Sequence, residues 1–178
     1  MEIIENLLSA EDCDVLTKQI KLKERPVGDR LVPLSFSAYA LQHTEMLLAS
    51  LTDKISNIVN KQLLPTYSYA RIYYTGATMP KHTDRHACEI SLSLSLTGDP
   101  WPLWFMLESP TPVSLSKGSA VIYSGIEIPH WREQYTGPGC TQVFLHWVDA
   151  DGPYADWQYD RRPAIGSAES EKFYWGKS

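Results

Sequence analysis

The sequence is 178 residues long, 43% hydrophobic and 21% charged, which fits one soluble globular domain with a substantial core. Its formal net charge of −5 and the lack of a Lys- and Arg-rich run argue against a broad binding surface for nucleic acid or an anionic membrane. The acidic N-terminus lacks the basic start of a signal peptide, and no run of 18 apolar residues predicts a membrane span. Cys13, Cys88 and Cys140 form no CxxC motif, so we expect no disulfide framework or zinc knuckle and a reducing, cytoplasmic location.

Two amphipathic helices are predicted in the first third of the chain. The first begins near Ser9, a typical N-cap residue, and carries apolar residues at helical spacing up to Ile20. The second shows apolar residues at intervals of three and four from Leu47 to Leu63, and it ends before Pro65. An irregular stretch rich in Pro, Gly and Ser separates the two helices.

From Tyr67 onward the pattern is typical of β-structure. The segment "EISLSLSL" alternates strictly, with its isoleucine and leucines on one face and its serines on the other, as expected of a strand. Turn signals then separate further short apolar segments at the regular spacing of a β-sandwich or barrel. The predicted strands are "YSYARIYY", "EISLSLSL", "PLWFMLE", "PVSLS", "SAVIYSG" and "TQVFLHWV".

These elements predict a mostly β fold with N-terminal helices. We expect a single domain over residues 1–178, in which residues 1–66 form a helical support and residues 67–150 form the β-core. Residues 151–178 mix aromatic and acidic side chains with Gly and Pro, so they are predicted to wrap irregularly around the body.

The segment "MPKHTDRHACE", residues 79–89, concentrates side chains that bind metals. His82 and Asp84 form an HxD motif, and in an extended strand residues two apart point to the same face, so both side chains can reach one cation. Such a triplet also arises by chance. Residues 43–45, His-Thr-Glu, form a similar one that opens the second predicted helix, where positions two apart diverge by about 200°.

Two further histidines are interpreted as ordinary residues. His86 lies four residues after His82, but an HxxxH zinc site needs a helix, and a strand is predicted to begin at Glu89. His146 lies in "VFLHWV", where a partly buried and hydrogen-bonded core histidine is expected. The HxD motif therefore needs support from its wider surroundings.

That support comes from the order of motifs along the chain. Tyr73 and Gly76 end a strand and form a turn before the HxD motif, "GSAVIYSG" follows it, and His130 lies beyond. This order resembles the iron(II)- and 2-oxoglutarate-dependent oxygenases, in particular their prolyl-4-hydroxylase-like branch, over roughly residues 67–150. The resemblance implies a double-stranded β-helix, a jelly-roll barrel of cupin type, with a metal site inside its mouth.

By this resemblance, His82, Asp84 and His130 would bind Fe(2+), and Tyr73 would donate its hydroxyl to a carboxylate of 2-oxoglutarate. Two histidines and one carboxylate leave coordination positions open for a bidentate 2-oxoacid and O2. The implied reaction is hydroxylation of a substrate with release of succinate and CO2, and ascorbate would support turnover.

The sequence departs from the family pattern near its last strand. The family usually places Arg or Lys about ten residues after the distal histidine, where it pairs with the far carboxylate of 2-oxoglutarate. This chain has Cys140–Gln142 there, so either the clamp comes from elsewhere or the co-substrate differs. Arg132, on the same strand face as the distal histidine, is our first choice and Arg71 the second. Arg132 could equally be a surface residue paired with Glu133.

The expected substrate is a peptidyl residue or a small amino-acid-like metabolite. Trp101, Trp104, Trp131 and Tyr135 could form an exposed aromatic rim that grips it, or they could belong to the core. The alternative function is a non-catalytic, cupin-like protein that binds a metal or small ligand. We expect no nucleic-acid or membrane partner, and the sequence predicts no particular oligomeric state.

Overall fold

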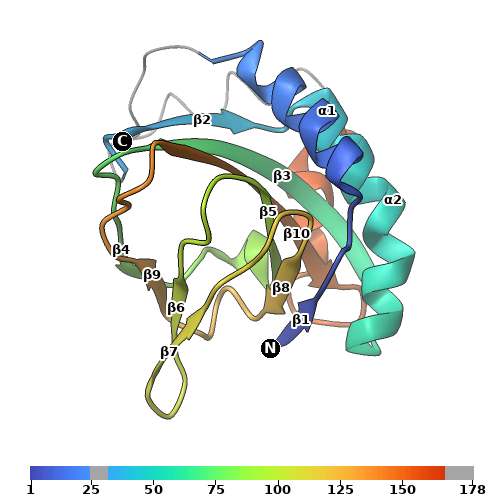
Figure 1. Ribbon diagram of the computed structural model, residues 1–178. Helices are drawn as coiled ribbons and strands as arrows, with labels where there is room; N and C mark the ends of the chain where they lie inside the picture. The colour runs from blue at the N-terminus through green and yellow to red at the C-terminus, as the bar shows by residue number, and fades with distance from the viewer. Residues whose placement is uncertain (25–31, 167–178) are drawn as a thin grey trace.

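The computed structural model describes residues 1–24 and 32–166, and its body consists of two antiparallel β-sheets that face each other (Figure 1). In these residues the larger sheet has the strand order β1-β8-β5-β10-β3-β2 and the smaller sheet β4-β9-β6-β7. From β3 onward, β3, β5, β8 and β10 lie in the larger sheet and β4, β6, β7 and β9 in the smaller, which is a jelly-roll arrangement.

The strands are β1 (Glu2–Ile4), β2 (Ser35–Tyr39), β3 (Leu63–Tyr74), β4 (Met79–His82), β5 (Ile90–Thr97), β6 (Leu103–Met106), β7 (Pro110–Val113), β8 (Ala120–Tyr123), β9 (His130–Arg132) and β10 (Gly139–Asp149). The helices are α1 (Ala10–Lys21) and α2 (Gln42–Val59), with 3-10 turns at η1 (His86–Cys88) and η2 (Ala155–Arg161).

Helix α1 begins, and helix α2 ends, at a residue suited to capping. The side chain of Ser9 accepts a hydrogen bond from the Asp12 backbone N–H at 3.1 Å, which confirms the predicted start of α1. Helix α2 is followed by Asn60, whose left-handed backbone (φ 53°) turns the chain so that the next N–H, that of Lys61, reaches the Ser56 carbonyl at 3.1 Å. Leu63, which its spacing assigns to this helix, instead opens β3, because the left-handed residue has already ended the helix.

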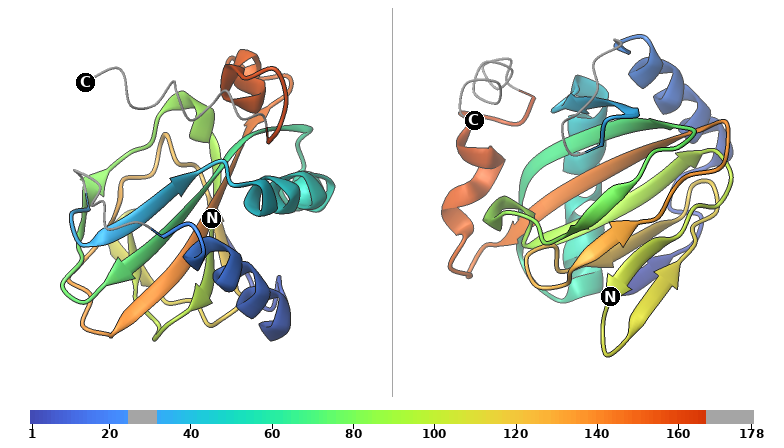
Figure 2. Two further views of the ribbon diagram at one scale, coloured as in Figure 1. Left: turned by 90° about the horizontal axis from the view of Figure 1, so that it is seen from above. Right: turned by 90° about the vertical axis from the view of Figure 1, so that its left-hand side faces the viewer.

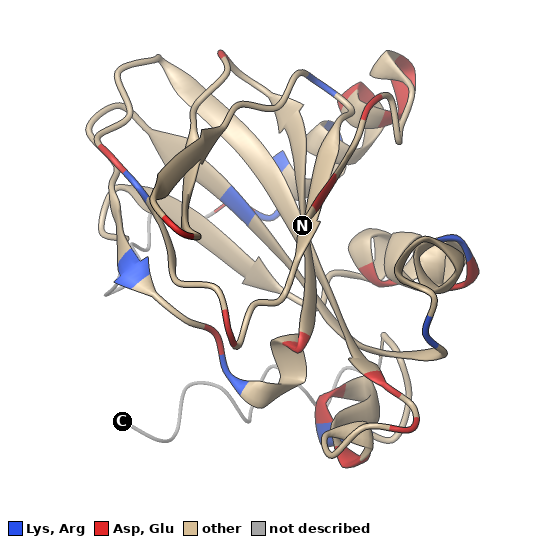
Figure 3. Cartoon of the chain, turned by 90° about the horizontal axis from the view of Figure 1, so that it is seen from below, with Lys and Arg blue, Asp and Glu red and all other residues tan. Residues whose placement is uncertain are grey.

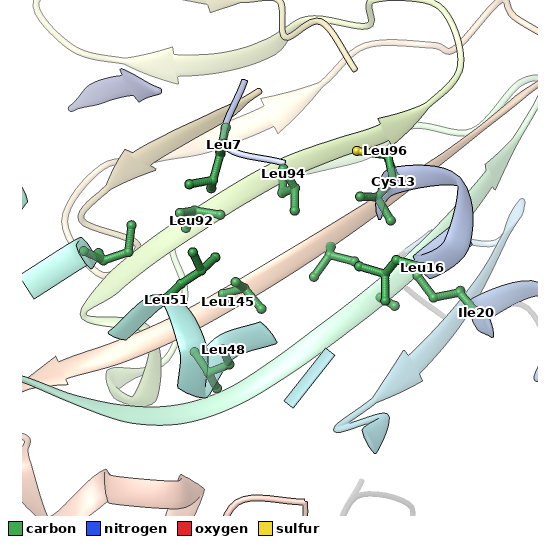
Figure 4. Packing of buried hydrophobic residues seen from close by; sticks show 14 of the residues in the cluster. Leu7, Cys13, Leu16, Ile20, Leu48, Leu51, Leu92, Leu94, Leu96 and Leu145 are labelled. Atoms are coloured by element: carbon green, nitrogen blue, oxygen red, sulfur yellow. The ribbon is translucent and has the colours of Figure 1, made fainter. Parts of the chain in front are cut away.

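Both helices pack on the outer face of the larger sheet, where they cover the leucine side of β5 (Figures 1 and 4). Leu92 and Leu94 are fully buried in this cluster, and burial of each leucine contributes about 2 kcal/mol. The serine side of β5 faces the space between the two sheets, because Ser91 pairs in register with Tyr123 of β8. The alternation predicted from the sequence therefore separates an apolar core from an interior that contains polar groups.

Two strands come from the region that we expected to be a helical support. β1 pairs with β8, and β2 lies at the edge of the larger sheet beside β3 (Figures 1 and 2). The N-terminal region therefore extends the larger sheet as well as covering it.

The C-terminal segment packs against β3 at the opposite end of the sheet from α1 (Figure 2). Arg162 Nη2 lies 2.8 Å from Glu45 Oε2, and both side chains are buried. Arg85 makes two hydrogen bonds to the carboxylate of Asp160. These ion pairs fasten residues up to 166 to the body, and residues 167–178 of the predicted wrap lie outside the described residues.

Charged residues are distributed over many elements of the described chain, and Lys and Arg occur on separate elements rather than in one row (Figure 3). Among residues 1–24 and 32–166, neither helix combines the length and apolar character that a membrane span requires.

Candidate metal centre

The three predicted metal ligands come together at one end of the smaller sheet. His82 ends β4 and His130 begins β9, and the two residues pair directly in the antiparallel ladder. Asp84 follows in the loop after β4, where its backbone N–H donates to the Gly125 carbonyl at 2.8 Å. Oδ1 of Asp84 lies 3.5 Å from His82 Nε2 and 3.7 Å from His130 Nε2. Ligand atoms bound at right angles about 2.1 Å from one metal lie about 3 Å apart, so a small contraction would accommodate a cation.

The hydrogen bonds of the two histidines orient them for metal binding. Nδ1 of His82 lies 2.8 Å from the Pro80 carbonyl, and Nδ1 of His130 lies 2.9 Å from the Ile128 carbonyl. Because a carbonyl oxygen only accepts, each Nδ1 carries the proton and each Nε2 keeps a free lone pair. Both free lone pairs belong to the nitrogens near Asp84, so this donor set fits a divalent metal ion.

The electrostatics of the triad also favour a cation. When His82 is protonated, a hydrogen bond from its ring to Asp84 stabilises the charged form and so raises the pKa of His82, whereas burial lowers the pKa of His130. Burial pushes the pKa of Asp84 upward, but the hydrogen bond from His82 and the attraction of the neighbouring histidines bring it below the usual value. Asp84 is therefore a carboxylate at neutral pH.

A second group of metal-binding side chains shares Asp84. Its ligand atoms lie within 4.8 Å of those of Cys88 and His146. Burial raises the pKa of the Cys88 thiol well above its usual value, and the Tyr67 hydroxyl lies 3.1 Å from its sulfur. Burial also lowers the pKa of His146 to about 4, and Nδ1 of this residue lies 3.0 Å from Ser91 Oγ. Cys88 and His146 are thus neutral buried groups, as expected for His146.

The region between the sheets also contains Arg132 and Tyr73, two of the three residues predicted to hold the co-substrate. Arg132 is only 2% exposed, so its predicted alternative as a surface residue paired with Glu133 is wrong. Its Nη1 donates to the Trp101 carbonyl, Nη2 donates to Gln142 Oε1 at 2.5 Å, and its Nε has no partner within the described chain. Tyr73 is fully buried, and its hydroxyl is likewise without a partner in the described chain.

Arg71 also points into this interior. Its Nε donates to Ser37 Oγ at 3.0 Å, and its guanidinium lies over the rings of Tyr69 and Tyr73, 5.2 and 5.6 Å from their centroids. In the ladder between β3 and β10, Arg71 stands opposite Gln142. The structure therefore brings Arg71, Tyr73 and Arg132 to one side of the larger sheet.

The predicted aromatic rim does not form one surface. Trp101 and Tyr135 are buried. Trp104 and Trp131 are partly exposed and stack on each other, with ring centroids 5.9 Å apart. Trp101, Trp104 and Tyr135 border a depression of about 290 Å³ whose lining includes none of the three metal ligands. Trp101, Trp104 and Tyr135 therefore line a depression that is separate from the three metal ligands.

Two residues beside Asp84 were not identified from the sequence. A Cβ atom at Gly125 would lie 2.5 Å from both Asp84 Oδ2 and Ser91 Oγ, so only glycine fits there. Ser91 Oγ itself lies 3.3 Å from Asp84 Oδ2. The alternation of β5 assigns Ser91 to the polar face, but only the folded chain shows that this face meets the metal ligand.

No family model matches the sequence, and no curated protein matches it either. Comparison with solved structures finds 2-oxoglutarate- and Fe(II)-dependent oxygenases. A viral collagen prolyl hydroxylase from Paramecium Bursaria Chlorella virus-1, in complex with 2-oxoglutarate, has a TM-score of 0.64 and 16% identity over 82% of this chain and 94% of that chain. An oxidoreductase of the 2-oxoglutarate-Fe(II) oxygenase family from Burkholderia pseudomallei has a TM-score of 0.67 and 13% identity over 82% of each chain. HygX from Streptomyces hygroscopicus, with nickel, 2-oxoglutarate and hygromycin B bound, has a TM-score of 0.67 and 8% identity over 84% of this chain and 82% of that chain.

At these identities the comparison establishes the fold. The structural neighbours are 2-oxoglutarate-Fe(II) oxygenases that include prolyl hydroxylases, and the predicted double-stranded β-helix is confirmed.

Proposed function

We propose that the protein is an iron(II)- and 2-oxoglutarate-dependent dioxygenase that hydroxylates its substrate. The observation that carries the proposal is the presence of two complementary sites in one interior. The triad of His82, Asp84 and His130 fits a cation, whereas the buried guanidinium of Arg132 has no acidic partner among residues 1–24 and 32–166. A 2-oxo diacid can serve both sites, because one end chelates a metal and the other end is a free carboxylate.

The burial of Arg132 argues for an anionic ligand. Arginine keeps its proton in proteins, and leaving its charge buried without a counterion costs several kcal/mol. The acceptors that Arg132 has, the Trp101 carbonyl and the Gln142 amide, are neutral. An incoming carboxylate would offset this cost, and the hydroxyl of Tyr73 would supply a second donor.

The spacing along β9 suits such a ligand. His130 and Arg132 are two residues apart in an extended strand, so they point to the same face about 6.6 Å apart along it. This separation is on the scale of a five-carbon diacid. Arg71, near the rings of Tyr69 and Tyr73, is the alternative clamp and would border the same ligand.

Bound Fe(2+) would supply the redox chemistry that activates O2 together with 2-oxoglutarate. The overall reaction balances when one oxygen atom enters the substrate and the other enters succinate, with release of CO2. Within this reaction Asp84 contributes the negative charge that binds the metal, while Tyr73 and Arg132 orient the co-substrate.

The substrate would approach from the side of His82. The side chain of His82 is 36% exposed, whereas that of His130 is 3% exposed, so the metal centre is open on the His82 side. We propose a peptidyl residue or a small amino-acid-like metabolite as the substrate. The likeness to a prolyl hydroxylase and to HygX, which has hygromycin B bound, is compatible with either size of substrate.

The proposal is tested by anaerobic titration of the metal-free protein with iron(II) and then with 2-oxoglutarate. We expect a weak visible charge-transfer band, its loss in Arg132→Ala, and its retention in Arg71→Ala. Retention in Arg132→Ala with loss in Arg71→Ala would assign the clamp to Arg71 instead.

The same experiment separates the enzyme from the alternative, a cupin-like binding protein. Iron binding without a band would overturn the 2-oxoglutarate assignment and favour the binding protein. We also expect His130→Ala to abolish iron-dependent succinate production, and normal production in that variant would contradict the triad.

A further inference from the structure

The two carboxylate oxygens of Asp84 have different surroundings. Oδ1 faces Nε2 of His82 and Nε2 of His130, at 3.5 and 3.7 Å. Oδ2 instead lies 3.3 Å from the hydroxyl of Ser91. The carboxylate therefore has one oxygen available to a metal and one oxygen held by the protein.

Ser91 connects this carboxylate to His146. Ser91 is fully buried on β5, and its Oγ lies 3.0 Å from His146 Nδ1 and 3.2 Å from the Cys88 carbonyl. A serine hydroxyl has a single proton to donate and two lone pairs that accept. The proton can go to Asp84 Oδ2 only if the nitrogen of His146 donates to Ser91 rather than accepting from it.

We propose that Ser91 and His146 are positioning residues that hold Asp84 in the orientation for metal binding, an inference that rests on the proposed metal centre. Nδ1–H of His146 donates to Ser91 Oγ, and the Ser91 hydroxyl donates to Asp84 Oδ2. The carboxylate is a stronger acceptor than the Cys88 carbonyl because it is charged. Oδ1 is then left to face the metal.

The surroundings of this chain of hydrogen bonds fix its geometry. The ring of His146 packs against the ring of Tyr67, with centroids 4.6 Å apart. On the other side, Gly125 approaches so closely that a Cβ would lie 2.5 Å from both Ser91 Oγ and Asp84 Oδ2. Partners of this kind commonly change metal affinity by about 10- to 100-fold when they are removed.

The test is a titration of the metal-free, full-length protein with cobalt(II). The visible absorption of the bound cobalt(II) reports its coordination, and the titration curve gives the binding affinity. Ser91→Ala removes the donor to Asp84, and we expect binding about 10-fold weaker with an altered spectrum. His146→Leu should have the same effect, whereas His146→Asn, whose amide N–H can replace Nδ1–H, should restore most of the affinity.

Ser93→Ala is the matched control. Ser93 follows on the same face of β5 and is equally buried, but its hydroxyl has no hydrogen-bond partner in the described part of the chain. We expect its affinity for cobalt(II) to match that of the wild type. Near-ultraviolet circular dichroism of each metal-free variant checks the fold, and if His146→Leu does not fold, Ser91→Ala and His146→Asn decide the question.

The outcomes separate this inference from the proposed function. If the wild type binds cobalt(II) and Ser91→Ala binds it with the same affinity and spectrum, the positioning role is overturned and the metal centre stands. If the wild type does not bind cobalt(II), or His130→Ala binds it equally well, the metal centre and the positioning role fall together.

Discussion

Gln142 accepts a hydrogen bond from Arg132 inside the barrel, with Oε1 of the amide 2.5 Å from Nη2 of the guanidinium. Gln142 lies on β10, within the segment where the resemblance seen in the sequence predicts a cationic clamp, and Arg132 lies on β9 of the opposite sheet. The neutral amide of Gln142 on the last strand therefore accepts a hydrogen bond from the guanidinium of Arg132, which β9 supplies. The guanidinium of Arg132 therefore gives the proposed co-substrate site a positive charge, although residues 139–142 contain no Lys or Arg.

Gln142→Glu should weaken the binding of 2-oxoglutarate. The substitution would place a carboxylate next to Arg132, so an internal ion pair would compete with the carboxylate of the co-substrate. We expect affinity for 2-oxoglutarate to fall at least about 10-fold, in line with the 1.5–3 kcal/mol of a hydrogen bond to a charged group, with cobalt(II) affinity unchanged. Isothermal titration calorimetry of the metal-free protein with cobalt(II), and then of the cobalt-loaded protein with 2-oxoglutarate, measures the two affinities.

Gln142→Leu separates charge from packing at the same position. It removes the acceptor without adding a charge, so we expect a smaller loss of 2-oxoglutarate affinity than in Gln142→Glu. Equal losses in the two variants would contradict competition by an ion pair, and normal binding in Gln142→Glu would exclude Arg132 as the clamp.

Gly125→Ala should disrupt the metal centre. The new Cβ would lie 2.5 Å from Asp84 Oδ2 and Ser91 Oγ, so either the carboxylate or the β5 strand has to move. We expect lower cobalt(II) affinity and a loss of about 1–3 kcal/mol in the free energy of unfolding, measured by urea denaturation. Gly139→Ala is the control, because the nearest atom to its Cβ would be the Tyr73 carbonyl oxygen at 3.4 Å. Equal cobalt(II) affinity in both variants would count against the close approach at Gly125.

Local patterns predicted the elements and the faces of the strands. The alternation of Ser91 to Leu96 is a property of neighbouring residues, and it correctly separated the helix-facing side of β5 from the side between the sheets. The same reasoning missed β1 and β2, which are short and pair with strands distant in the sequence. It also predicted that α2 continues past Asn60, because the spacing of apolar residues does not reveal that Asn60 has a left-handed backbone.

The candidate site was predicted only where its geometry is local or where the family resemblance supplied it. His82 and Asp84 are two residues apart, so extended backbone predicts that they converge, although β4 ends at His82 and Asp84 lies in the loop that follows. Their proximity to His130 depends on the pairing of β4 with β9. The family resemblance implied this proximity, but the spacing of residues along the chain does not predict which strands pair. The burial of Arg132 depends on contacts with Trp101 and Gln142 from other segments, so the sequence left open whether it is a surface residue.

The pH dependence of stability should report the burial of His146. Burial lowers its pKa from 6.5 to about 4, so at pH 5 the unfolded chain binds a proton at this residue and the folded chain does not. Stability is therefore unaffected by this residue above pH 6.5 and falls as the pH drops from 6.5 toward 4, by about 3 kcal/mol in total. Urea denaturation of the metal-free protein between pH 7 and pH 4.5 measures the slope. His146→Asn should show a shallower slope, and equal slopes would contradict the prediction.

The ion pair between Arg162 and Glu45 should contribute to the stability of the whole domain. Oε2 of Glu45 accepts from Arg162 Nη2 at 2.8 Å, and Oε1 accepts from the backbone N–H and the hydroxyl of Ser68 at 2.7 and 2.8 Å. Arg162→Leu would remove the cation and leave the Glu45 carboxylate, whose side chain is 2% exposed, without its counterion. Breaking a buried ion pair in this way costs about 3–5 kcal/mol.

Arg161→Leu provides the matched control for this prediction. Arg161 is the preceding residue, but its ion pair with Asp156 is exposed, with side chains 55% and 62% accessible. Exposed pairs contribute about 0–1 kcal/mol, so the free energy of unfolding should hardly change in this variant. Because Arg162 also donates to the carbonyls of Tyr159 and Thr66, the double variant Glu45→Leu/Arg162→Leu separates the uncompensated charge from the loss of these contacts. We expect the double variant to be more stable than Arg162→Leu, since it no longer buries a lone carboxylate. A double variant that is no more stable than Arg162→Leu would show that the uncompensated carboxylate is not the cause of the loss.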